Sequence, residues 1–142
     1  MNTHKIFEQL KKIEPVTLMV RHAERFEITR YSKPLHTLLT EKGKADAVEY
    51  GKAAAVLSPL TIYHSPVKRC RQTAEGIARG LEEAGGETEL QGPCRELGDP
   101  YVMDNYDSTW ELFDRFGHHG FIREWFSGRL SRDYLLPLEE AA

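Results

Sequence analysis

The sequence predicts an α/β fold, a three-layer sandwich in which a mainly parallel sheet is flanked by helices. The order of the expected elements supports this prediction. Short apolar runs at residues 16–20, 60–63 and 87–90 alternate with long helical patterns at residues 40–57 and 65–84. Helices that connect successive strands form right-handed βαβ units, which place the strands parallel to one another and the helices on the faces of the sheet.

The composition is that of one soluble globular domain spanning residues 1–142. The chain contains 19 Lys and Arg residues and 22 Asp and Glu residues, so its formal net charge is −3, and 40% of its residues are hydrophobic. This balance argues against a nucleic-acid-binding module. No apolar run reaches the roughly 18 residues of a membrane span, and Cys70 and Cys94 show no metal-ligand or disulfide pattern. We expect a cytoplasmic protein without a metal site.

The run Val16–Val20 is the first expected strand. It lacks the alternation of apolar and polar residues, which is typical of a strand that is covered on both faces. A charged segment, RHAER, follows it at residues 21–25. Because parallel sheets bind ligands at the carboxyl ends of their strands, Arg21 and His22 are candidate site residues.

The helical patterns have recognisable ends. Thr40 is the expected N-cap of the first long helix, which stops before Ser58-Pro59. After the strand at residues 60–63, Ser65 is the expected N-cap of the second helix, with Pro66 at its first position. That helix has an apolar stripe that includes Leu81, and a pair of glycines at residues 85–86 ends it. A third strand at residues 87–90 completes the pattern.

The last third of the chain has a different pattern. Two aromatic-rich helices are expected on either side of the segment 117–120, which reads GHHG. From Pro137 onward the residues resemble the opening turn of a helix that has no C-terminal signal. The chain is therefore expected to end inside an element, so that the domain is C-terminally incomplete and lacks its last strand.

Arg21 and His22 together suit attack on a phosphoryl group. A neutral imidazole is a competent nucleophile, and a neighbouring guanidinium favours the neutral ring and binds an anionic substrate. The alternative is a solvated turn. A second anion-binding element is the start of the helix after Ser65, where Lys68, Arg69 and Arg71 oppose the helix dipole. Either arginine is able to reach the cleft, and the alternative is a basic surface.

Three ordered segments carry a family resemblance: RHAE at residues 21–24, LTEKG at residues 39–43 and SPVKRCRQTA at residues 65–74. Over about residues 15 to 100 the chain resembles the histidine phosphatase superfamily, the phosphoglycerate-mutase-like proteins. The resemblance implies that His22 is phosphorylated during turnover and that Arg21 and Arg69 bind the phosphate. Arg71 does not occupy the family's arginine position. Ala23 stands where the family more often has Gly, a small-for-small change.

The resemblance also implies an acid that protonates the leaving group. Glu96 is the first choice and Asp99 the second, while the alternative for Glu96 is a loop carboxylate paired with Arg95. The loop at residues 25–36 is expected to shape the leaving-group pocket.

The family's second histidine, in a Ser-His-Gly or Ser-His-Asp setting after a later strand, has no counterpart in the sequence. His118 and His119 are expected to form a hinge or cap. His64 stands where relatives have Ser or Thr, and a hydrogen-bonded structural role is preferred to a place in the pocket.

The expected function is hydrolysis of a phosphomonoester through a covalent phosphohistidine on His22, without a metal or cofactor. The substrate is expected to be a small phosphorylated molecule or a phosphoprotein. Three alternatives stay open: a phosphoglycerate-mutase-like phosphotransferase, a phosphate-binding or interaction domain without turnover, and the N-terminal part of a longer enzyme. The sequence does not identify the phosphomonoester or the oligomeric state, for which a homodimer is one option.

Overall fold

The computed structural model describes residues 3–13, 15–28, 34–98, 103 and 106–141. The chain divides into two compact units, residues 1–94 and 95–142. The first unit contains the helices α1 (Thr3–Leu10), α2 (Glu41–Ala54) and α3 (Lys68–Glu83), and the strands β1 (Leu60–His64) and β2 (Thr88–Pro93). It also contains two short 3-10 helices, η1 (Pro34–His36) and η2 (Ala55–Leu57). The second unit contains η3 (Arg95–Leu97), α4 (Tyr106–Phe126) and α5 (Leu138–Ala141).

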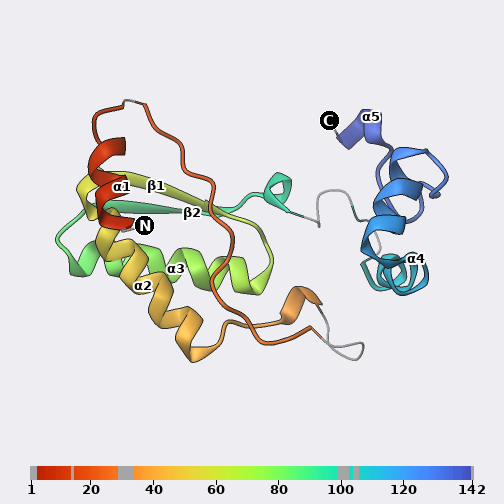
Figure 1. Cartoon of the computed structure of the whole chain (residues 1–142), viewed down its shortest axis with the longest axis horizontal. Helices are drawn as coiled ribbons and strands as arrows, with labels where there is room; N and C mark the ends of the chain where they lie inside the picture. Colours follow the sequence, from red (N-terminus) through yellow and green to blue (C-terminus); the bar gives the residue numbers. More distant parts are fainter. Residues whose placement is uncertain (1–2, 14, 29–33, 99–102, 104–105, 142) are drawn as a thin grey trace. The chain divides into compact units, whose positions relative to one another are not determined.

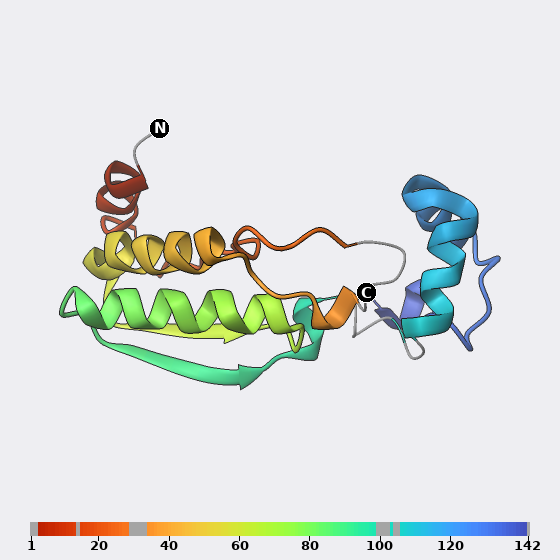
Figure 2. The same cartoon turned by 90° about the horizontal axis from the view of Figure 1, so that it is seen from below.

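A βαβ unit forms the centre of the first unit. β1 and β2 pair in parallel, with Leu60 opposite Thr88 and Ile62 opposite Leu90. The connecting helix α3 packs against both strands, and α2 packs against α3 (Figures 1 and 2). The predicted α/β class, the parallel pairing and the order strand–helix–strand are therefore confirmed for residues 60–93.

α2 and α3 lie in backbone contact. A Cβ atom on Gly51 would overlap the carbonyl of Ile77, and one on Gly80 would overlap the carbonyl of Val48. Glycine at both crossing positions lets the helices approach more closely than side chains would allow. Leu81, which is fully buried, lies on the predicted apolar stripe of α3. This close packing fixes α2 and α3 relative to each other.

The predicted buried strand at Val16–Val20 is wrong. These residues are not in a strand, and Leu18, Met19 and Val20 are 37%, 91% and 46% exposed. In the described part of the chain the sheet has two strands, β1 and β2. A β-rich run expresses a local preference, but a strand also needs a neighbour for its N–H and C=O groups.

β1 covers one face. Its residues alternate between half-buried Leu60 and Ile62 and exposed Thr61 and Tyr63, and it ends in buried His64. One covered face agrees with the packing of α3 on this sheet. Helices on both faces, the three-layer arrangement, stay a prediction.

The predicted start of the second helix is also corrected. The N-cap of α3 is Val67, two residues after Ser65, and its backbone is extended. Val67 is 3% exposed, so its side chain is packed in the core. Its backbone is still extended, and the helix therefore begins only at Lys68. The Ser65 hydroxyl instead accepts a hydrogen bond from the Val67 N–H, at 3.4 Å. The other three predicted ends hold: Thr40 caps α2, the helical segment stops before Ser58-Pro59, and Gly85, at φ +80°, follows α3.

The second unit has its own small core of Met103, Phe121 and Leu135. α4 is broken at Gly117, where φ is +64°, a conformation that favours glycine. The predicted break between two aromatic helices is confirmed. α5 begins directly after Pro137, as the sequence indicates, and the Trp125 indole donates to the Leu136 carbonyl at 2.8 Å. None of the described helices combines the length and the apolar character that crossing a membrane requires.

Candidate functional site

His22 lies just before a segment that is held by backbone pairing. The Thr40 N–H donates to the Glu24 carbonyl and the Phe26 N–H donates to the Leu38 carbonyl, both at 3.1 Å. These bonds surround an antiparallel bridge between Arg25 and Leu39. The chain that follows His22 is therefore attached to the chain that enters α2.

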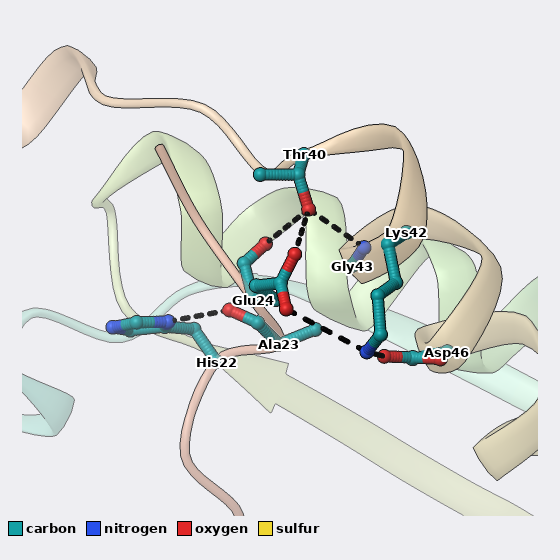
Figure 3. Close-up of polar contacts among 7 residues, drawn as sticks. All are labelled: His22, Ala23, Glu24, Thr40, Lys42, Gly43 and Asp46. Atoms are coloured by element: carbon teal, nitrogen blue, oxygen red, sulfur yellow. Dashed lines mark hydrogen bonds and ion pairs between the residues drawn. The ribbon is translucent and has the colours of Figure 1, made fainter. Parts of the chain in front are cut away.

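The His22 ring has a defined orientation. Its Nδ1 atom lies 2.8 Å from the carbonyl oxygen of Ala23 (Figure 3). A carbonyl oxygen only accepts hydrogen bonds, so Nδ1 must carry the hydrogen. In the neutral ring the lone pair is then on Nε2, the atom free to act as nucleophile or ligand.

The environment of His22 favours the neutral ring. Its pKa is lowered from the ordinary value of 6.5, first because burial removes water from the charged form. The bond to the Ala23 carbonyl acts in the opposite direction, and the positive charges of Arg69, Arg21 and Arg25 lower the pKa further. Three arginines thus lie close enough to act on the imidazole. The ring is therefore a candidate nucleophile in electropositive surroundings.

The cations at the start of α3 occupy different environments. Arg69 is buried, with 9% of its surface exposed. Arg71 is exposed and forms an ion pair with Glu75, its Nε lying 2.7 Å from Oε1. Lys68 is exposed. Of the two arginines that the helical geometry left open, Arg69 is the one whose charge acts on His22.

Arg21 borders a small cavity beside the His22 segment. The cavity has a volume of about 190 Å³ and lies between this segment and residues of α2 and α3, among them Asp46 and Thr73. Arg21 itself is exposed. Its guanidinium is thus available to an anion from solvent while its charge acts on the neighbouring ring.

The second turn of α3 contacts both loop segments of the site. The Thr73 hydroxyl accepts a hydrogen bond from the Ala23 N–H at 3.0 Å and donates to the Arg69 carbonyl at 2.8 Å. The Gln72 side-chain oxygen accepts from the Leu39 N–H at 2.9 Å. α3 therefore carries Arg69 and also holds the segment with His22.

The first turn of α2 forms a second attachment. The Thr40 hydroxyl caps the helix by accepting from the Gly43 N–H at 3.0 Å, and it donates to the Glu24 carboxylate at 2.8 Å (Figure 3). Lys42 lies between two carboxylates, 3.6 Å from that of Glu24 and hydrogen-bonded to Asp46. These carboxylates raise the pKa of the exposed Lys42 amine, so the ammonium stays charged across the neutral range.

The roles of Thr73, Gln72 and Thr40 at the site were not predicted from the sequence, although all three lie in the quoted motifs. A threonine four residues after Arg69 is known to bond back along its own helix. Which N–H it accepts from outside the helix depends on tertiary structure, and the sequence contains no signal for that.

The remaining candidate residues are two histidines outside the His22 segment and the candidate acid. Buried His64 donates from Nδ1 to the Ser65 carbonyl at 2.8 Å, as the structural interpretation predicts. His118 stacks on Phe113 directly after the break in α4. Glu96, in η3 of the second unit, is exposed.

The second candidate acid, Asp99, and residues 29–33 of the loop at 25–36 lie outside the described residues. In the described ranges no three or more His, Cys, Asp or Glu side chains gather as a metal site would need.

Comparison with known proteins defines the family. No curated protein and no solved structure matches the chain significantly. The model of the Histidine phosphatase superfamily (branch 1) matches residues 17–95, more than half of the chain. The match includes His22, Arg21 and Arg69 and ends one residue before Glu96. The chain thus belongs to the histidine phosphatase superfamily, branch 1.

Proposed function

We propose that the protein hydrolyses a phosphomonoester through a covalent phosphohistidine on His22. The observation that carries the proposal is the state of this ring. Its Nδ1–H is held by the Ala23 carbonyl, its pKa is lowered, and three arginines act on it. This leaves a neutral imidazole with its Nε2 lone pair next to positive charge, which suits attack on an anionic phosphoryl group.

In the first step, the Nε2 atom forms a bond to phosphorus while the bond from phosphorus to the leaving oxygen breaks. Arg69 and Arg21 neutralise the equatorial phosphoryl oxygens, and the N-terminus of α3 adds partial positive charge. The corrected N-cap makes Val67, rather than Ser65, the origin of this dipole. The departing alkoxide takes a proton from a general acid.

In the second step, water attacks the phosphorus atom of the phosphohistidine and gives a proton to the conjugate base of the acid that acted in the first step. The N–P bond breaks, inorganic phosphate leaves and the Nε2 lone pair is restored. The arginines supply the charge neutralisation that both steps need. A protonated Nδ1 that stays bonded to the Ala23 carbonyl keeps the ring in place through both steps.

The proposal is tested by assaying the full chain with p-nitrophenyl phosphate in the presence of EDTA. We expect EDTA-resistant hydrolysis by the wild type and by the control variant His119→Ala, whose histidine is exposed in the second unit. His22→Ala should be inactive. Equal activity of His22→Ala and wild type would overturn the proposal. Binding of phosphate or vanadate without hydrolysis would instead support a phosphate-binding domain.

A further inference from the structure

We infer that Thr73 is a positioning residue that holds His22 and Arg69 in register for phosphoryl transfer. This role rests on the proposed function of His22 as nucleophile. The Thr73 hydroxyl binds the backbone N–H of Ala23, the residue after His22, and the backbone carbonyl of Arg69 itself.

The Thr73 hydroxyl acts both as a hydrogen-bond donor and as an acceptor. A threonine hydroxyl has one hydrogen to donate and lone pairs to accept with. Here the hydrogen goes to the Arg69 carbonyl, one turn earlier in α3, and a lone pair accepts the Ala23 N–H. Thr73 is only 7% exposed, so water has little access to replace either bond when the hydroxyl is removed.

Ala23 connects this hydroxyl to the imidazole. Its N–H is held by Thr73 and its carbonyl accepts from Nδ1 of His22. Both polar backbone groups of one residue are thus engaged, one by α3 and one by the ring. Fixing the position of Ala23 therefore fixes the carbonyl that selects the Nδ1–H tautomer and leaves Nε2 on the side of the ring away from Ala23 (Figure 3).

Among the residues that the structure describes, few other bonds hold this part of the chain. Residues 16–20, which precede it, do not pair as a strand in the described structure. The nearest attachments downstream are those of Glu24 with Thr40, on the far side of Ala23 from the ring. The bond from Ala23 to Thr73 is therefore the attachment closest to His22 among those that the structure describes.

The test compares two substitutions of similar size and opposite chemistry. Thr73→Val keeps the branched shape and removes both hydrogen bonds, whereas Thr73→Ser keeps the hydroxyl and removes the methyl group. We expect Thr73→Val to lower kcat by about tenfold to about a hundredfold with KM changed by less than about twofold, because misplacement of a reacting group reduces rate more than binding. Thr73→Ser should keep most of the activity.

A second readout does not depend on activity. Nitrogen chemical shifts of the His22 ring, measured by NMR above pH 7, distinguish the Nδ1–H from the Nε2–H tautomer. We expect the Nδ1–H form in wild type and Thr73→Ser, and a shift towards the Nε2–H form in Thr73→Val. This readout holds even if the protein hydrolyses no phosphomonoester, so it separates failure of this inference from failure of the proposed function.

If Thr73→Val does not fold, amide hydrogen exchange of the wild type still tests the bond between Ala23 and Thr73. The Ala23 amide should be protected in the wild type and in Thr73→Ser, while the amide of Met19, a residue that is 91% exposed, should exchange rapidly. An unprotected Ala23 amide would overturn the inference. It would also be overturned by an unchanged tautomer and kcat in Thr73→Val, or by Thr73→Ser being as impaired as Thr73→Val, which would indicate a packing role.

Discussion

The Cα atom of Gly43, in the first turn of α2, lies directly against the carbonyl of Glu24, two residues after His22. A Cβ atom on Gly43 would overlap this carbonyl, and it would also crowd the carbonyl carbon and the amide nitrogen of Glu24. Because backbone atoms cannot move aside as a flexible side chain does, this contact limits position 43 to glycine. The helix and the segment that carries His22 are thus packed backbone to backbone.

Gly43→Ala should therefore destabilise the protein by about 1–3 kcal/mol, the usual cost of an overpacked position. Urea denaturation measures the effect. Gly92→Ala is the matched control, because a Cβ atom there meets nothing within 4 Å. A Gly43→Ala protein as stable as the control would show that the contact with Glu24 is not close in solution.

Thr40→Ala should cost about 1 kcal/mol of stability, since the hydroxyl caps α2 through the Gly43 N–H. It also releases the Glu24 carboxylate that the same hydroxyl binds. Thr40→Ser keeps the oxygen and should restore most of the loss, as measured by thermal unfolding. Equal destabilisation by both substitutions would assign the loss to the methyl group rather than to the cap.

The two arginines of α3 provide a matched pair for the anion site. Arg69→Gln should weaken competitive inhibition by inorganic phosphate by about tenfold to about a hundredfold, the range of a lost hydrogen bond to a charged group. Arg71→Gln should have little effect, because Arg71 is exposed and paired with Glu75. Equal effects of the two substitutions would mean that the site responds to net charge alone.

Much of the first unit could be predicted from the sequence because its elements carry local signals. Thr40 caps α2, the apolar stripe of α3 includes buried Leu81, and the positive φ of Gly85 ends that helix as the glycine pair predicts. The parallel pairing of β1 and β2 followed from the order of the elements alone.

The incorrect or missing predictions concern residues whose structure depends on contacts with distant parts of the chain. The β-rich run at residues 16–20 contains no information about a neighbouring strand, and it is exposed rather than paired. Ser65 and Pro66 match a helix start, but buried Val67 keeps an extended backbone and becomes the N-cap. Thr73 was missed because its external partner, the Ala23 N–H, is fifty residues away in the chain.

The lowered pKa of His22 predicts the acidic limb of the pH–rate profile. Attack needs the neutral ring, so kcat/KM should fall as the pH drops through a value below 6.5. Arg69→Gln removes one of the charges that lower this pKa, so the residual activity of that variant should show its limb at a higher pH. An acidic limb at or above 6.5 in the wild type would contradict the assignment to His22.

The same shift links His22 to stability. Below pH 6.5 the unfolded chain binds a proton at His22 more readily than the folded chain does, because the folded pKa is lowered. The stabilising contribution is therefore complete above pH 6.5 and is lost as the pH falls through the folded pKa. His22→Asn should remove this part of the pH dependence in urea denaturation at a series of pH values. An identical pH dependence in the variant would exclude His22 as its source.

The most direct measurement of the central claim is capture of the phosphoryl group on His22. The full chain is mixed with p-nitrophenyl phosphate, quenched in alkali, which preserves the N–P bond, and analysed by peptide mass spectrometry. We predict one phosphoryl group on His22 in the wild type and in His119→Asn, lost on exposure to acid, and none in His22→Asn. Hydrolysis that leaves His22 unmodified, or a phosphoryl group on another residue such as His64, would contradict the account.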